Sequence, residues 1–117
     1  TLRMGWVLSI KIVFGSAAER EAFATLWRPL AEYCRSNEPR TLAYELLLSD
    51  KDEATACVFE RYASKEDLAE HQQSEPFKTF KATLAQAEAE GTIRRVSVDG
   101  HSYNESAVGY MSREASA

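Results

Sequence analysis

The sequence is poor in residues that mark special classes of protein. It has only two cysteines, Cys34 and Cys57, and neither stands in a CxxC pair or a Cys/His cluster. The small number argues against a disulfide-stabilised secreted fold, and the spacing argues against a metal site. We therefore expect two buried, reduced thiols in a cytoplasmic protein that holds no metal.

Long apolar runs and an excess of positive charge are also missing. No stretch approaches the roughly 20 apolar residues that span a bilayer, so we expect no membrane partner. The apolar start, residues 4–14, includes Ser9 and Lys11 and has no small-residue cleavage site, unlike a signal peptide. The net charge is −4, and Arg94 with Arg95 is the only adjacent basic pair. Nucleic acid is therefore not an expected partner either.

The sequence does contain a regular series of strand and helix patterns. Apolar residues alternate at 4–14, 40–48, 54–62 and 92–99, which predicts four strands. Apolar stripes with three- to four-residue spacing predict one helix from Ser16 to the region of 36–39 and another from Ser74 to Gly91. A short helix is expected after Ser64, and Pro29 should kink the first helix.

The order of these elements predicts the fold class. The series β-α-β-β-α-α-β is that of an α+β, ferredoxin-like domain, a four-stranded antiparallel sheet with helices on one face. We place this domain at residues 1–99 and a C-terminal arm or tail at residues 100–117, which either packs on a partner or frays. Several strands carry apolar residues on the helix-free face, so we expect a homodimer that pairs sheet to sheet.

Candidates for chemistry are few, because the sequence has no nucleophile elbow and no phosphate-binding glycine loop. His71 falls in the predicted short helix. It is either a surface histidine or a general acid/base, since imidazole titrates near neutrality. His101 falls in the polar tail, where we expect no role.

Glu60 is the second candidate, because it interrupts the third predicted strand between Phe59 and Arg61. A carboxylate on the helix-covered face would need a hydrogen-bond donor, for which His71, Tyr44 and Arg61 are available. A purely structural ion pair is the alternative. Aromatic residues are numerous, and most should belong to the core, while a few could line a flat apolar pocket for a quinol or polycyclic phenol.

Three blocks of the sequence resemble the antibiotic-biosynthesis-monooxygenase domain over residues 4–98. They are the strand that holds Tyr44, the run Phe59-Glu60-Arg61-Tyr62, and the helical segment 68–80 with its His-x-x-Ser-x-x-Phe pattern. The resemblance implies a dimeric α/β barrel with a pocket between the sheet and the helices of each protomer. It also implies oxidation of a quinol or phenol by molecular oxygen without a cofactor. By this resemblance His71, Glu60 and Tyr44 are the predicted catalytic residues, and the predicted substrate-binding residues are Trp27, Tyr62, Phe77 and Phe80.

The same resemblance, examined position by position, argues against two other activities found among members of this family. Haem-degrading relatives have a tryptophan at the place of His71 and a haem-ligating histidine where Lys81 stands, so we expect no haem. An isomerase branch keeps the histidine but needs a cationic phosphate site, and we find no candidate. The expected function is a small cofactor-independent monooxygenase that takes a small aromatic substrate and molecular oxygen. The alternatives are an acid/base isomerase that uses the same pocket and a non-enzymatic ligand-binding or stress-associated dimer.

Overall fold

The computed structural model describes residues 5–113 of the chain. The sheet is formed by β1 (Trp6–Phe14), β2 (Thr41–Leu48), β3 (Thr55–Tyr62) and β4 (Arg95–Asn104). The helices are α1 (Ala17–Asn37), α2 (Asp67–Gln72) and α3 (Glu75–Glu90). The first residue of the predicted 4–14 strand and the last four of the predicted arm lie outside the described residues.

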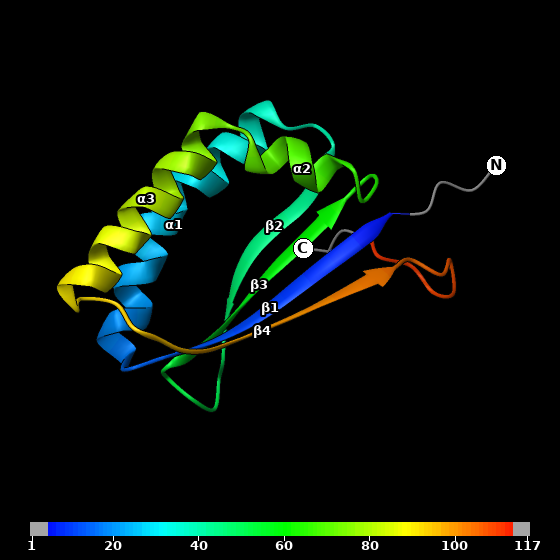
Figure 1. Cartoon of the computed structure of the whole chain (residues 1–117). Helices are drawn as coiled ribbons and strands as arrows, with labels where there is room; N and C mark the ends of the chain where they lie inside the picture. The colour runs from blue at the N-terminus through cyan, green and yellow to red at the C-terminus, as the bar shows by residue number, and fades with distance from the viewer. Residues whose placement is uncertain (1–4, 114–117) are drawn as a thin grey trace.

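The four strands form one antiparallel sheet in the order β2-β3-β1-β4, with β1 and β3 in the centre. This is the predicted ferredoxin-like topology, and the expected hairpin between β2 and β3 is present. Figure 1 shows α1 and α3 side by side on one side of the sheet, with the short α2 near one end of β2 and β3.

The helix ends follow the local sequence. Ser16 caps α1 by accepting a hydrogen bond from the backbone N–H of Glu19. Ser74 caps α3 in the same way, and Gly91 ends α3 in the left-handed conformation, with φ of 79°. The helix α1 continues through Pro29, so this proline does not divide it into two helices. These caps fix where the helices begin and end relative to the strands.

The core lies between the helices and the sheet. Strand residues that point to the helices pack against apolar residues of α1 and α3, with Phe23 at a ring distance of 5.0 Å from Phe14 and 5.7 Å from Phe80. The buried members of this cluster are Ile12, Phe14, Phe23, Trp27, Ala56, Val58, Leu84 and Ile93. Toward the α2 end of the sheet the buried residues become polar, and Glu60 and His71 lie there.

The last strand differs from its prediction. We expected it at residues 92–99, but β4 runs from Arg95 to Asn104, so residues 100–104 of the predicted arm belong to the sheet. All ten residues of β4 are exposed. Beyond the strand, the Glu105 carboxylate pairs with Arg61 of β3 and accepts a hydrogen bond from the backbone N–H of Gly5. The chain after β4 is thus attached to the sheet at Glu105.

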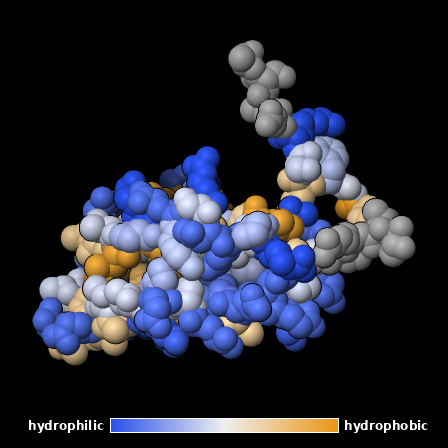
Figure 2. Space-filling view, turned by 90° about the horizontal axis from the view of Figure 1, so that it is seen from above, coloured by the Kyte–Doolittle hydropathy of each residue, from blue (hydrophilic) through white to orange (hydrophobic). Residues whose placement is uncertain are grey.

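The helix-free face of the sheet is a mixture of apolar and charged residues. The strand register places Phe59 beside Ser9 and Glu45, and Cys57 beside Lys11 and Leu47. The predicted apolar surface is therefore present but interrupted by charge. No helix among residues 5–113 is long and apolar enough to cross a bilayer. The face seen from above in Figure 2 is mainly hydrophilic, with separate hydrophobic patches.

Candidate functional site

His71 is buried in the protein rather than exposed on the surface of α2. Only 2% of the residue is exposed. Its ring lies edge-on to Tyr44 and Phe77, with centroids 5.0 Å away in each case, and 5.9 Å from the ring of Tyr62. A histidine that folding places among three aromatic rings needs specific polar partners to offset its loss of water. The alternative that His71 is a surface histidine is therefore wrong.

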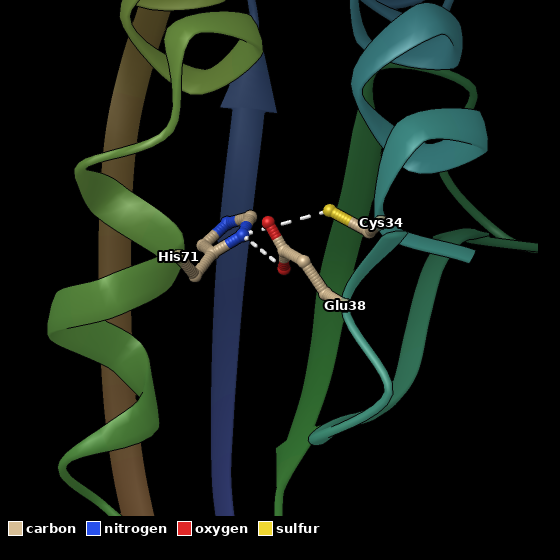
Figure 3. A group of neighbouring side chains, drawn as sticks. All are labelled: Cys34, Glu38 and His71. Atoms are coloured by element: carbon tan, nitrogen blue, oxygen red, sulfur yellow. Dashed lines mark hydrogen bonds and ion pairs between the residues drawn. The ribbon is translucent and has the colours of Figure 1, made fainter. Parts of the chain in front are cut away.

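The polar partners of His71 come from the end of α1. The imidazole Nδ1 lies 2.9 Å from Oε1 of Glu38 and 3.5 Å from Sγ of Cys34. Figure 3 shows both side chains reaching toward the imidazole. The backbone N–H of Glu38 donates to the carbonyl of Cys34, four residues earlier. This i to i+4 geometry places the thiol and the carboxylate on one side of the helix end.

The contact with Glu38 determines which nitrogen of the His71 imidazole carries a proton. A carboxylate can only accept hydrogen bonds, so Nδ1 of His71 carries a proton in this pair. In neutral imidazole the other nitrogen, Nε2, then has a free lone pair. Nε2 is buried and has no hydrogen-bond partner among the described residues. The arrangement thus combines an oriented imidazole with one unused acceptor, as in a general base.

Glu60 is a buried acid, with 5% exposure. Its carboxyl group accepts a 2.5 Å hydrogen bond from the hydroxyl of Tyr62, which lies two residues along the same strand and on the same face. Burial raises the pKa of Glu60 to about 7, the bond from Tyr62 opposes that rise, and the charge of Glu38 adds to it. Glu60 can therefore exchange a proton near neutral pH. The donors that we expected, His71, Tyr44 and Arg61, are not the ones that it uses.

Other acidic groups around the site are held in their neutral forms. Burial raises the pKa of the Tyr44 hydroxyl, and the neighbouring charge of Glu60 raises it further. Burial likewise raises the pKa of the Cys34 thiol, together with the charges of Glu38 and Glu60. Burial and the neighbouring carboxylates therefore disfavour ionisation of Tyr44 and Cys34 in the metal-free protein.

Two cavities meet this polar cluster. The first, about 430 Å³, is lined by Glu38 and His71 and otherwise mainly by polar residues that include Asn37, Arg40 and Asp67. The second, about 780 Å³, lies along α1 and β2, and its lining includes Trp27, Cys34, Tyr44, Leu42 and Leu46. The stacked rings of Trp27 and Tyr44, with centroids 4.6 Å apart, form part of its wall.

The structure brings some of the predicted site residues together and places others elsewhere. His71, Tyr44 and Phe77 lie together, and Trp27 extends this aromatic group into the larger cavity. Tyr62 is completely buried and donates to Glu60. Phe80 packs edge-on against Phe23 beside the core. Their roles toward a substrate stay predictions, and the structure gives Tyr62 a supporting contact with Glu60.

Sequence reasoning missed Glu38 and Cys34. The sequence has no Cys/His cluster, but the fold brings Cys34 to His71 from 37 residues away. The spacing of Cys34 and Glu38 in the last turn of a predicted helix was a usable signal. It needed the position of α2 before it could be connected with His71.

Comparison with known proteins agrees with this fold. The family model described as antibiotic biosynthesis monooxygenase matches residues 13–83, more than half of the chain. Among curated proteins, none matches the sequence significantly.

Solved structures share the architecture. A candidate antibiotic biosynthesis monooxygenase from Nitrosomonas europaea has a TM-score of 0.73 at 20% identity, over 92% of this chain and 94% of that one. One from Caulobacter crescentus has a TM-score of 0.66 at 26% identity, over 86% and 87% of the two chains. A Pseudomonas aeruginosa protein has a TM-score of 0.69 at 20% identity, over 92% and 99%. The chain belongs to the antibiotic biosynthesis monooxygenase family.

Proposed function

We propose that the protein is an oxidoreductase that oxidises a phenol or quinol with molecular oxygen and without a cofactor. The observation that carries this proposal is the buried His71, whose Nδ1 is bound to Glu38 while Nε2 has no partner. Such an imidazole can remove the proton of a substrate hydroxyl and create the electron-rich phenolate that reacts with oxygen. In this proposal His71 is the base, through Nε2, and Glu38 is the positioning residue, through its contact with Nδ1.

The proposed reaction is balanced in atoms and electrons. His71 takes the hydroxyl proton, and oxygen then attacks a ring carbon of the phenolate. One oxygen atom becomes a carbonyl at that carbon, and the other leaves as water with the ring hydrogen and the hydroxyl proton. A phenol gives a quinone and a quinol gives a hydroxyquinone. The four electrons that the ring loses are the four that O₂ gains, so no further reductant is required.

The larger cavity is the proposed place for the aromatic ring. Because His71 lines the smaller cavity and not this one, we place the substrate hydroxyl at the Tyr44 end, next to the imidazole. Trp27, Tyr44 and Leu46 supply flat apolar surface there, and Tyr44 also touches the ring of His71. Glu60 lies behind this group with its pKa near 7, where it can take up or return a proton during turnover. We also propose that the protein works as a homodimer, because the helix-free face and the whole of β4 leave apolar side chains exposed.

The test is oxygen uptake by chelator-treated protein with menadiol-type quinols and simple phenols. The rate of oxygen uptake with the wild-type protein should exceed the rate of autoxidation without protein. His71→Ala should lower kcat by about 10²- to 10⁴-fold, the usual contribution of a general base. Glu38→Gln should also lower kcat with little change in KM, while His101→Asn, on exposed β4, should match wild type. Background rates with every substrate, or full activity in His71→Ala, would refute the proposal.

One observation favours a second candidate, an acid/base isomerase. The cavity that reaches Glu38 and His71 is lined mainly by polar residues, which suits a hydrophilic substrate better than a polycyclic one. The same oriented base would then move a proton between two carbon or oxygen atoms. Exchange of substrate hydrogen with deuterated water, dependent on His71 and independent of oxygen, would support this function over the first.

A further inference from the structure

We propose that Cys34, Glu38 and His71 form a binding site for a divalent transition-metal ion of the zinc class. The ligand atoms are the Sγ of Cys34, a carboxylate oxygen of Glu38 and the Nδ1 of His71. All three lie within 4.8 Å of one another. The site offers one sulfur, one oxygen and one nitrogen, and Figure 3 shows the thiol and the carboxylate both directed toward the imidazole.

The distances suit a tetrahedral ion. Zinc is bound at about 2.3 Å by sulfur and at about 2.0 to 2.2 Å by nitrogen and oxygen, which puts ligand atoms roughly 3.3 to 3.6 Å apart. The observed Nδ1–Sγ distance is 3.5 Å, and the Nδ1–Oε1 distance is 2.9 Å. The third distance, between Sγ and the carboxylate oxygen, is at most 4.8 Å. To admit the ion, the carboxylate has to move a few tenths of an ångström away from the imidazole and turn toward the thiol.

The backbone holds the three ligands in place. Cys34 and Glu38 are joined by the hydrogen bond that closes the last turn of α1. On the other side, the hydroxyl of Ser74 donates to the carbonyl of His71 and accepts from the N–H of Phe77, which ties α2 to the start of α3. Because the thiol and the imidazole are both almost completely buried, the fold limits their movement.

The site also has a route to solvent. Glu38 and His71 line the 430 Å³ cavity, so an ion can enter from it, and a water molecule could complete the tetrahedron there. The donor set determines which ions are suited. Thiolate and imidazole favour Zn²⁺ and Co²⁺, whereas Mg²⁺ and Ca²⁺ prefer sites built only of oxygen.

Binding has a defined proton balance. The Cys34 thiol releases its proton to solvent as the metal–sulfur bond forms, and the Nδ1 proton of His71 moves to Nε2. The protonated Nε2 can then no longer accept a proton. If the proposed function is correct, the metal-bound protein is therefore the inactive form, and metal occupancy would regulate the oxidation.

The test uses Co²⁺ as a spectroscopic probe and needs no turnover. Wild-type protein treated with one equivalent of Co²⁺ should show tetrahedral d–d absorption and a sulfur-to-cobalt charge-transfer band. Cys34→Ser should lose the charge-transfer band, and Glu38→Gln and His71→Ala should bind at least tenfold more weakly. Cys57→Ser is the matched control and should keep the band, because Cys57 lies on the opposite face of the sheet.

A second measurement covers variants that fold poorly. Zn²⁺ should raise the melting temperature of wild type and of Cys57→Ser, and it should leave Cys34→Ser unchanged at matched secondary-structure content by circular dichroism. An unaltered charge-transfer band in Cys34→Ser, or its loss in Cys57→Ser alone, would overturn the proposal. Absence of any charge-transfer band in the wild-type protein at millimolar Co²⁺ would overturn it as well.

Discussion

Among single residues, Glu60 gives the clearest link between burial and pH. Its pKa is about 7 in the folded protein and about 4.5 in the unfolded chain. Between these values the folded state keeps a proton that the unfolded state has released, so raising the pH favours unfolding. The shift corresponds to about 3 kcal/mol of stability lost between pH 4.5 and a pH above 7.

We therefore predict that Glu60→Gln flattens the dependence of the unfolding free energy on pH between pH 5 and 8. Denaturant unfolding at several pH values measures this slope. The pKa values of Glu19, Asp52, Asp67 and Glu105 are lowered, so the stabilising effect of these acids is lost only as the pH falls into the acid range. Equal slopes for wild type and variant would contradict the burial account of Glu60.

Single-residue chemistry was only partly predictable from the sequence. His71 and Glu60 could be found because each is a titratable residue within a predicted apolar element. Tyr62 could have been recognised as the donor to Glu60 from their spacing along one strand. The pairing of His71 with Glu38 could not be found in this way, because it depends on how α2 packs against the end of α1.

At the scale of the elements, α2 is held by the cap of the next helix. Ser74 caps α3 and also binds the carbonyl of His71, so the same hydroxyl supports the helix and the histidine. Ser16 caps α1 without contact to His71. A comparison of substitutions at these two serines therefore distinguishes an effect on helix stability from an effect on the support of His71.

We predict that Ser74→Ala and Ser16→Ala each lower the unfolding free energy by about 1 kcal/mol, the usual value of an N-cap. Only Ser74→Ala should also lower turnover, because it releases the backbone of α2. Thermal or denaturant unfolding gives the first quantity, and oxygen uptake gives the second. Equal turnover in the two variants would show that the Ser74 contact with His71 has no functional effect.

Most elements were predictable because their signals are local. Alternation identified the first three strands, and the serine caps and Gly91 marked the helix ends. The end of β4 was not predictable, since Gly100, His101 and Ser102 have no apolar alternation. They belong to the sheet because they pair with β1, a contact made across most of the chain.

At the scale of the whole molecule, the fold protects only one face of its sheet. The other face presents Phe59, Leu47 and Tyr103 among charged residues, and β4 is exposed along its full length. Burial of this surface against a second copy is the simplest way to remove apolar side chains from water.

We therefore predict a particle of twice the 13.1 kDa chain mass by light scattering at micromolar concentration. Phe59→Glu, near the middle of the helix-free face, should give a monomer. Lys78→Glu, at an exposed side chain of α3, should leave the mass unchanged. A monomeric wild-type protein would refute the sheet-to-sheet pairing.

The central claim concerns one proton on His71. Nitrogen-15 NMR of the imidazole groups measures its position directly, and the protein has only two histidines, so His101→Asn assigns the spectrum. For metal-free protein with a neutral His71 imidazole, we predict a proton on Nδ1 and a bare, acceptor-type Nε2, with loss of this preference in Glu38→Gln. A His71 that carries its proton on Nε2 in the metal-free protein, or whose tautomers do not respond to Glu38→Gln, would contradict the account.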